Sequence, residues 1–520
     1  MLIEDQSAVI AALQKHKTYG SKDKTVLVRH SNISIVFLNA DKAYKLKRGV
    51  KYAYVDYSTL EKRKEACKRE MILCERTAPG LCIGVEAVLQ DRKGRFYIAS
   101  VCEDKEASVV DYVLVMNRFD EAMIFENMAE KGLLDRFEMM DLAEKIADLH
   151  VAGEVFFDCG GSNMIRGRIM ENDGLLRCFV PSIFDMSDID DLKKNALEAL
   201  EKYGPLLDER KKGGKVRWCH GDTHFHNIVM RDGKPSIFDP IEFNDELTKI
   251  DVLYDLAYLL MDMEDRGLKR LASILFNHYM VLSADWEGVP AFPLFLSCRA
   301  CVQAYVCAQR SVELEDSDQK KLFAERAYRY LQISRRFLSP PPPVLVACGG
   351  LSGSGKSRLT RELAPFIGSP PGAVVLRDDI LRKNMFQVSH DRSLGAEAYT
   401  PENEEKVYGM LFRECERVLK TGQSVAADAL FHNPKYRQEI EELARRLNVR
   451  FVGFWADAPL EIRTQRVFSR KRNPSDVKTF DALEAQLSVD VGNVTWEIID
   501  TSGDRSETLD RAQSVLKKGE

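Results

Sequence analysis

A glycine-rich run at residues 350–357 is the most specific chemical motif in the chain. Its sequence is Gly-Leu-Ser-Gly-Ser-Gly-Lys-Ser, and it follows the apolar run Val344–Cys348. A β-rich run that leads into G-x-x-x-x-G-K-S and a helix-compatible segment is typical of a phosphate-binding loop, or P-loop. There, backbone N–H groups and the helix N-terminus hold the phosphates, the lysine reaches the terminal ones, and the last hydroxyl ligates Mg²⁺. We therefore expect ATP and Mg²⁺ to bind Gly350, Leu351, Ser352, Gly353, Ser354, Gly355, Lys356 and Ser357.

A second group of chemically competent residues lies upstream, between residues 218 and 240. Asp222 is followed by Asn227, and Asp239 then ends the short apolar run Ser236–Phe238. An Asp, an Asn five residues later and an Asp at the end of a short strand supply a base for a hydroxyl and two Mg²⁺ ligands.

Three histidines in the same stretch offer an alternative metal interpretation. Zinc ligation by H-x-x-x-H spacing needs a helix, whereas the apolar run 228–230 and the turn 231–233 indicate a loop that leads into a hairpin. We therefore favour the phosphate-handling interpretation over a zinc cluster made of His220, His224, His226 and Asp222.

Two predicted elements near the N-terminus, a strand and a helix, carry further candidate site residues. In the strand pattern 42–47, Ala43, Lys45 and Lys47 share a face, because side chains alternate with period two. One of these lysines would pair with nucleotide phosphates, or would be a solvated edge-strand residue, and the spacing does not distinguish Lys45 from Lys47. The helical pattern 58–74 carries Glu70, which would pair with Lys45 or lie on the surface.

Three further polar sets follow apolar strands of the C-terminal part. Arg377, Asp378 and Asp379 come after one strand, where an acid would accept a proton from a substrate hydroxyl. Asp428 ends the strand Ser-Val-Ala-Ala-Asp, which is the expected place for a Mg²⁺ or Mg²⁺-water ligand. Two arginines lie one helical turn apart on one face and would both reach a transferred phosphate; they are Arg466 and Arg470.

The composition describes a globular protein of several domains. A chain of 520 residues is too long for one core, and roughly two to four domains are expected. A net charge of -5 gives no electrostatic case for nucleic acid or anionic membranes. No apolar run approaches the roughly 18 residues that span a bilayer, and the N-terminus is unlike a signal peptide, so we expect a cytoplasmic protein.

The twelve cysteines are expected to be reduced, and the pair Cys298 and Cys301 lies in a helical run that favours no metal or redox role.

The order of predicted elements indicates two folds in series. A helix over residues 1–20 precedes strands over 26–47, 83–89 and 96–102, and the run 112–119 would form an inter-lobe hinge in which Met116 contacts nucleotide. Helices then dominate from 121–131, 136–151 and 188–203 to about 338. Strands followed by helices without a linker indicate two lobes of one α+β unit, about 1–118 and 119–338.

The proline run Ser339–Pro343 predicts a short extended linker, because four prolines cannot continue a helix. Beyond it, strands and helices alternate from residue 344 to 520. The predicted strands are 344–348, 373–376, 424–428, 450–455 and 496–500. This pattern predicts a three-layer α/β domain with a parallel sheet and a ligand at the C-terminal ends of the strands.

The upstream motif resembles a known family. His-Gly-Asp-Thr-His-Phe-His-Asn with Ile-Phe-Asp resembles the H-G-D-x-x-x-x-N loop and metal-binding Asp of aminoglycoside phosphotransferases and other protein-kinase-like small-molecule kinases. The resemblance implies that Asp222 is the catalytic base, that Asn227 and Asp239 bind metal, and that Lys45 with Glu70 meets the phosphates. His220 would structure the loop.

The likeness extends to the following helix but not to the start of the domain. An Asp of the helix after the metal site buttresses the catalytic loop in this family, and either Asp251 or Asp255 would do so here; Asp251 would otherwise be a helix N-cap. Residues 29–34 replace the G-x-G-x-x-G loop of protein kinases.

The C-terminal part resembles small P-loop kinases related to gluconate kinase, nucleoside and nucleotide kinases and zeta-type toxins. That resemblance implies that Asp378 or Asp379 is the substrate-side acid and that Arg466 and Arg470 belong to a lid. The order of the two parts is similar to bacterial proteins described as bifunctional aminoglycoside phosphotransferase/ATP-binding proteins, over nearly the whole chain.

Together these features predict an ATP-dependent kinase with two nucleotide sites that phosphorylates a small-molecule hydroxyl. One alternative has an active P-loop kinase and an upstream domain that binds substrate or regulates. A second alternative is a nucleotide-gated binding or toxin-neutralising protein. The fold and catalytic loop do not fix the acceptor.

Overall fold

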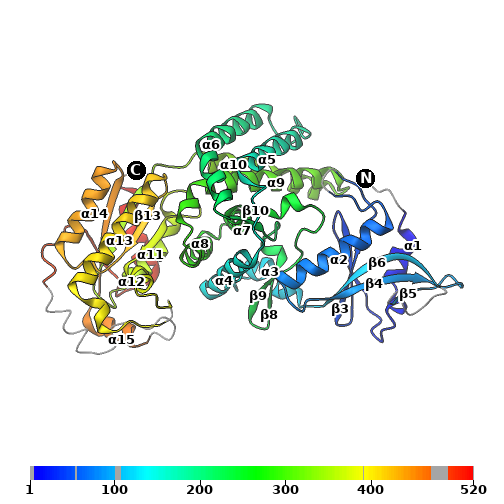
Figure 1. The fold of residues 1–520 in the computed structure, drawn as a ribbon, viewed down its shortest axis with the longest axis horizontal. Coiled ribbons are helices and arrows are strands. Elements are labelled where there is room, and N and C mark those ends of the chain that lie inside the picture. The colour runs from blue at the N-terminus through cyan, green and yellow to red at the C-terminus, as the bar shows by residue number, and fades with distance from the viewer. Residues whose placement is uncertain (1–4, 53–54, 100–106, 390–391, 470–489, 519–520) are drawn as a thin grey trace. The chain divides into compact units, whose positions relative to one another are not determined.

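The computed structural model describes residues 5–52, 55–99, 107–389, 392–469 and 490–518 (Figure 1). It forms two compact units. The first contains Met1–Ile165 and Gly204–Asp262, and the second contains Arg166–Tyr203 and Met263–Glu520. The predicted linker at residues 339–343 therefore falls inside the second compact unit.

The first unit begins with a short helix, α1 (Ser7–Leu13), and a six-stranded antiparallel sheet in the order β1-β2-β3-β6-β4-β5. Strand alternation sends one set of apolar side chains to a core with α1, including Phe37, Leu46 and Val113. The strands are β1 (Leu27–His30), β2 (Ser34–Asn39), β3 (Lys42–Lys47), β4 (Cys82–Gln90), β5 (Phe96–Ala99) and β6 (Ser108–Asn117).

The other face of this sheet is covered by α2 (Leu60–Thr77), which lies along β4 and β6 in Figure 1. The Thr59 side chain accepts a hydrogen bond from the Lys62 N–H and so caps the helix. Cys67 and Cys74 of α2 pack against Leu114 of the sheet. This packing turns Glu70 inward, toward β3.

The rest of the first unit builds the upstream motif. Helix α4 (Arg136–Ala152) begins with a capping box of Asp135 and Glu138. The predicted hairpin is present: β8 (Ile228–Arg231) pairs with β9 (Lys234–Ile237), and Asp232 and Gly233 both have positive φ, as its tight turn requires. The remaining elements are α3 (Phe125–Glu130), β7 (Val216–Trp218), β10 (Lys249–Asp251) and α7 (Val252–Asp265).

Two helices have residues in both units: α5 (Gly161–Arg177), which the sequence pattern did not predict, and α6 (Met186–Lys212), which is longer than predicted. Within the described residues, the stretch Trp286–Glu313 is long and apolar enough to cross a membrane, which corrects the expectation that no run approaches that length. However, 78% of its most apolar window is buried inside the fold, as in a core helix. Its main part, α9 (Phe292–Glu313), packs against α10 (Ser317–Phe337), and α8 (Lys269–Ser283) precedes both.

The C-terminal part is the predicted three-layer α/β fold with a parallel sheet in the order β12-β13-β11-β14-β15. Leu359 and Leu363 of α11 and Leu516 of α17 pack on one face, and α13 and α14 contact the sheet on the other side. The strands are β11 (Val344–Gly349), β12 (Val374–Arg377), β13 (Val425–Asp428), β14 (Arg450–Asp457) and β15 (Glu497–Asp500). The helices are α11 (Lys356–Leu363), α12 (Asp378–Met385), α13 (Pro401–Lys420), α14 (Pro434–Arg446), α15 (Leu460–Phe468) and α17 (Arg505–Lys517). The fold class predicted for both parts is therefore confirmed.

One side chain of α8 hydrogen-bonds to the edge of this sheet. Asn277 Oδ1 accepts from the Val375 N–H at 2.7 Å, and Nδ2 donates to the Ala373 carbonyl at 3.2 Å. The amide thus takes the place of a neighbouring strand along β12, whose other side pairs with β13. Arg270 of α8 also forms an ion pair with Glu362 of α11. Helix α8 therefore contacts both the edge strand β12 and helix α11, which follows the glycine-rich loop.

We predict that Asn277→Leu exposes this strand edge. The substitution removes both hydrogen bonds while keeping a similar volume, and leaves a half-buried N–H and C=O without partners, which costs about 1–3 kcal/mol. Hydrogen exchange of the Val375 amide should accelerate at least tenfold, roughly 1.4 kcal/mol. Leu282→Ala, at an exposed position of the same helix, is the control. Unchanged protection of Val375 in Asn277→Leu would show that the amide contributes nothing to this edge.

Candidate active sites

The upstream loop that contains Asp222 is held by α7. Gly221 has a φ of +87°, and a Cβ there would lie 2.7 Å from the Leu247 carbonyl oxygen, so only glycine fits. The Gly221 N–H donates to Asp255 Oδ1 at 2.8 Å, and Asp255 Oδ2 lies 3.1 Å from His150 Nε2. Of the two aspartates left open by the sequence, Asp255 is therefore the one in contact with the loop.

The other aspartate, Asp251, has a different environment. Both of its oxygens accept hydrogen bonds from Arg210, at 2.7 and 2.8 Å. Oδ1 also accepts from the Leu253 N–H at 2.9 Å, at the start of α7. Asp251 therefore anchors the beginning of the helix, as an N-cap does.

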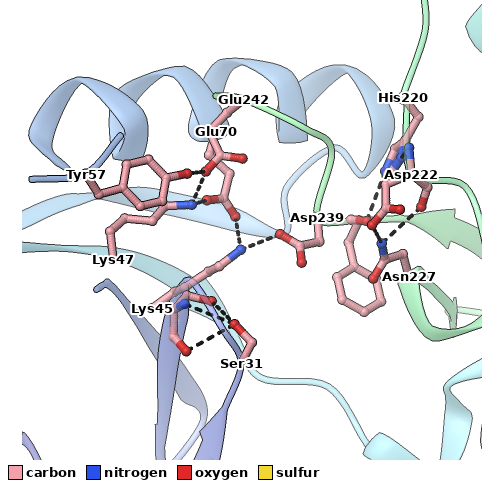
Figure 2. A network of polar contacts seen from close by, with 12 residues as sticks. Ser31, Lys45, Lys47, Tyr57, Glu70, His220, Asp222, Asn227, Asp239 and Glu242 are labelled. Atoms are coloured by element: carbon pink, nitrogen blue, oxygen red, sulfur yellow. Dashed lines mark hydrogen bonds and ion pairs between the residues drawn. The ribbon is translucent and has the colours of Figure 1, made fainter. Parts of the chain in front are cut away.

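Asp222 and Asn227 lie side by side in this loop (Figure 2). Asn227 Nδ2 donates to Asp222 Oδ2 at 2.8 Å and to the Asp222 carbonyl at 3.0 Å, so its other amide atom, Oδ1, is oriented away from Asp222. His224 Nε2 lies 3.3 Å from Asp222 Oδ2. Desolvation raises the pKa of Asp222, but His224 outweighs it and holds the pKa below its ordinary value. Asp222 is therefore ionised at neutral pH, as a proton acceptor must be.

The three histidines of the stretch do not converge on one point. His220 Nε2 donates to the Phe238 carbonyl at 3.0 Å, and His220 Nδ1 accepts from the Asp222 N–H at 3.3 Å. Burial lowers the pKa of His220, so the ring is neutral and ties the loop to the residue before Asp239. His226 instead pairs with Glu126 at 2.8 Å. The three rings therefore contact three different groups.

Asp239 is the point where the loop meets the small-lobe sheet. Its backbone has a φ of +60°, a conformation that is uncommon outside glycine and is typical of constrained functional positions. Its side chain is 41% exposed and forms an ion pair with Lys45. Desolvation raises the pKa of Asp239, but Lys45 and Lys47 outweigh it and hold the pKa well below its usual range.

Lys45 connects Asp239 to α2. Its ammonium donates to Glu70 Oε1 at 2.7 Å, which is one of the two alternatives that the sequence left open for Glu70. Met116, the predicted nucleotide contact, lies on β6 opposite Ala43 of β3. The ionised, half-exposed Asp239 carboxylate and the Asn227 amide oxygen are each oxygen donors of the kind that suits Mg²⁺.

In the C-terminal part, the glycine-rich run forms a loop between β11 and α11. Gly353 has a φ of +81°, and a Cβ there would lie 2.5 Å from the Arg463 carbonyl oxygen. The Gly350 N–H donates to the Leu430 carbonyl at 3.1 Å, so this end of the loop is tied to the chain after β13. The loop then enters α11 at Lys356, which is the arrangement of a phosphate-binding loop.

Ser357 and Asp428 provide a candidate cation site beside this loop. Asp428 is 2% exposed, and its Oδ1 has no hydrogen-bond partner among the described residues. Burial raises the pKa of Asp428, while Lys356, Arg377 and a hydrogen bond from Ser357 oppose the rise. A buried carboxylate oxygen without a partner is costly, and a bound cation or its water would satisfy it. The donors present therefore fit Mg²⁺.

The two acids that follow β12 have different environments. Asp379 accepts two hydrogen bonds from Arg377, at 3.0 and 2.6 Å, and its charge is neutralised there. Among the described residues, Asp378 Oδ2 accepts one long hydrogen bond, from the Leu430 N–H at 3.4 Å. Desolvation and the negative charge of Asp379 raise the pKa of Asp378 to about 6. Of the two candidates, Asp378 has the environment of a general base.

The predicted arginines are only partly placed by the structure. Arg466 donates to the Thr501 hydroxyl at 3.1 Å and to the Thr501 carbonyl, and so braces the loop after β15. Arg470 lies outside the described residues. Arg463, which the sequence pattern did not single out, is buried and donates to the Ser352 carbonyl of the glycine-rich loop at 2.9 Å. Its spacing of three residues from Arg466 was the available sequence indication.

Two segments of the chain match known protein families. Residues 170–292 match the phosphotransferase enzyme family, and residues 345–489 match an AAA domain.

Relatives match either nearly the whole chain or a smaller share of it. The uncharacterized protein Rv2004c of Mycobacterium tuberculosis is 27% identical over 499 residues, which is 94% of this chain and 95% of that protein. An adenylyl-sulfate kinase of Myxococcus xanthus is 31% identical over 117 residues, 22% of this chain and 59% of that protein. Among solved structures, a choline/ethanolamine kinase family protein of Mesorhizobium loti matches 61% of this chain and 91% of its own, with 14% identity and a TM-score of 0.38.

We predict that the raised pKa of Asp378 governs the pH dependence of turnover at the C-terminal site. Because its pKa is about 6, the base form is lost as the pH falls through that value. In an Asp222→Ala background, kcat/KM for ATP should rise to a plateau with a midpoint near pH 6. Asp378→Asn should lower the plateau by about 100-fold or more and remove that midpoint.

Two controls accompany this experiment. Asp379→Asn removes the negative charge that raises the pKa of Asp378, so the midpoint should shift to lower pH. A raised pKa in the folded state also means that ionised Asp378 destabilises the fold, so Asp378→Asn should be at least as stable as the parent at pH 8. An unchanged midpoint in Asp378→Asn would assign the titration to another group.

Proposed function

We propose that this chain, which joins a domain of the phosphotransferase enzyme family to a P-loop kinase domain, is an ATP-dependent phosphotransferase with two nucleotide sites. Each site transfers the γ-phosphoryl group of ATP to a hydroxyl of a small molecule. The observation that supports the proposal is that each part contains a lysine, an aspartate that could accept a proton, and side-chain oxygens that could bind a cation. In the upstream part these are Lys45, Asp222, Asn227 and Asp239; in the C-terminal part they are Lys356, Asp378, Ser357 and Asp428.

At the upstream site, Asp222 accepts the proton of the acceptor hydroxyl at its carboxylate. Asn227 fixes the orientation of that carboxylate through the 2.8 Å hydrogen bond, and His224 keeps it ionised. Lys45 neutralises phosphate charge while Glu70 holds it in place. Asn227 and Asp239 are the residues that would hold Mg²⁺, which would supply electrostatic stabilisation of the phosphate oxygens.

At the C-terminal site, the loop 350–357 positions the phosphates with backbone N–H groups, and Lys356 adds positive charge. Asp378 takes the acceptor proton. Ser357 and Asp428 are the residues that would hold Mg²⁺, and the predicted lid arginines, Arg466 and Arg470, would add charge around the transferred group. Positioning and charge account for catalysis at both sites, because phosphoryl transfer needs little covalent help from the protein.

The expected partners are ATP, Mg²⁺ and a small hydroxylated acceptor, in a cytoplasmic protein. The net charge of -5 supports neither nucleic acid nor anionic membrane as a partner. The phosphotransferase and P-loop kinase matches are consistent with such an acceptor but do not define its chemistry.

One observation favours a second candidate, in which only the C-terminal site turns over ATP. The loop between β1 and β2 stands where protein kinases have a glycine-rich loop, and it is closed on itself. The Ser31 N–H donates to the Ser34 carbonyl at 2.9 Å, and the Ser34 N–H donates to Ser31 Oγ at 3.0 Å. These N–H groups are therefore occupied, and the upstream domain would then bind substrate or regulate.

Separate inactivation of the two sites tests the proposal. Asp222→Ala removes the upstream base, and Lys356→Ala removes the P-loop charge. Each substitution should inactivate its own site and leave phosphate transfer at the other site unchanged. Each affected site should lose about 100-fold or more in kcat. Phosphate transfer from labelled ATP to a panel of sugars, polyols, nucleosides and aminoglycosides gives the measurement.

The controls are substitutions of exposed residues with the same charge, Glu61→Ala and Lys321→Ala. Two independent partial losses support two active sites. Loss of all turnover in Lys356→Ala together with full activity in Asp222→Ala supports the one-site candidate. Full activity in both variants contradicts both candidates.

A further inference from the structure

A second lysine of β3 lies deeper in the upstream site than Lys45. Lys47 has 0% exposure and forms ion pairs with Glu70 and with Glu242. Glu70 therefore binds two lysines at once: Oε1 accepts from Lys45 and Oε2 from Lys47 (Figure 2). A simple lysine–glutamate pair needs only the first of these contacts.

Glu242 links this buried pair to the segment that carries Asp239. It lies three residues after Asp239, is 3% exposed, and accepts hydrogen bonds from both Lys47 and the Tyr57 hydroxyl. Phe243 packs edge-on against the Tyr57 ring, with centroids 6.5 Å apart. The segment after Asp239 is thus fastened to the small-lobe sheet by a buried ion pair and an aromatic contact.

The formal charges of this cluster do not cancel. Lys45 and Lys47 face Glu70, Glu242 and Asp239, which is two positive charges against three negative ones. Asp239 is also the most exposed of the three acids, at 41% against 3% for the two glutamates. If Lys45 moves from Asp239 to a phosphate, Glu70 keeps Lys47 as its partner and Asp239 becomes available to a cation.

We propose that Lys47, Glu242 and Tyr57 are positioning residues, which hold Glu70 and the Asp239 segment in their working geometry before nucleotide binds. Under this proposal Lys45 meets the phosphates and Lys47 does not. It rests on the proposed function of the upstream site. The partners of the two lysines support it: both carboxylate partners of Lys47 are 3% exposed, whereas the Asp239 partner of Lys45 is 41% exposed and so can be exchanged for a ligand from solvent.

The test combines two measurements in a Lys356→Ala background. Hydrogen exchange reports how firmly the segment after Asp239 is held, and kinetics report turnover at the upstream site. Glu242→Gln keeps the shape but weakens the ion pair, so amide exchange in residues 238–243 should accelerate at least tenfold without nucleotide. The upstream kcat should fall about 10- to 100-fold with little change in KM for ATP, as expected when catalytic groups move by about 1 Å. Lys45→Met, in contrast, should remove the ion pair with the phosphates and weaken ATP binding, while amide exchange in residues 238–243 stays slow.

A second variant guards against misfolding, since a lone buried charge is strongly destabilising. Lys47→Met with Glu242→Leu removes both charges together and leaves Glu70 paired with Lys45, so the fold should persist while the segment after Asp239 loosens. Lys62→Met breaks an exposed ion pair with Asp56 in the same lobe and should change neither measurement.

Each result decides between the possibilities. Normal exchange in residues 238–243 in both Glu242→Gln and the double variant overturns the proposal. Loss of phosphate interaction in Lys47→Met but not in Lys45→Met overturns the assignment of Lys45. If the Lys356→Ala parent shows no upstream turnover, the proposed catalytic function fails, and the exchange measurement still decides whether Glu242 holds the segment.

Discussion

The need to compensate buried carboxylates is the constraint on which both candidate sites depend. A carboxylate removed from water is costly unless a cation or several hydrogen bonds replace its hydration. In the upstream part, α2 can bury Glu70 against β3 only because two lysines share the strand face that it meets. In the C-terminal part, Asp428 is buried at the end of β13, where Lys356, Arg377 and Ser357 surround it. The positions of the strands are therefore tied to the positions of the charges.

This constraint explains why neighbouring acids in one site behave differently. Asp379 lies against Arg377 and is neutralised, whereas the adjacent Asp378 lies near Asp379 without a comparable partner, and its pKa is raised to about 6. Asp251 and Asp255 differ in the same manner: Arg210 occupies the first, and the second accepts from the loop N–H of Gly221. In each pair, one acid is bound by an arginine. The other acid is the candidate base in the first pair, Asp378, and contacts the loop of Asp222 in the second pair, Asp255.

Sequence patterns predicted the elements that form unbroken apolar runs and missed those whose pattern is interrupted. The five strands of the C-terminal sheet were predicted because parallel strands are buried on both faces and form unbroken apolar runs. Helix α5 was missed because Gly167 and Gly174 interrupt its pattern, and α6 was predicted too short because it continues through Pro205. The role of Glu242 had no local signature, because its lysine partner is 195 residues away in the sequence. Long-range pairing is decided by packing, which no single stretch of sequence encodes.

The two parts solve the same electrostatic problem with different groups, and this difference has consequences for each. The loop 350–357 offers backbone N–H groups, which remain when a side chain is replaced, so Lys356 adds to a cradle that the main chain already forms. In the upstream part the β1–β2 turn uses the N–H groups of Ser31 and Ser34 internally, and positive charge comes from the side chains of β3. Such a site depends on holding a flexible ammonium in one place, which requires fixed carboxylates around it. Under the proposal made above, the buried Lys47, paired with Glu70 and Glu242, holds the upstream site in place as the loop backbone does in the C-terminal part.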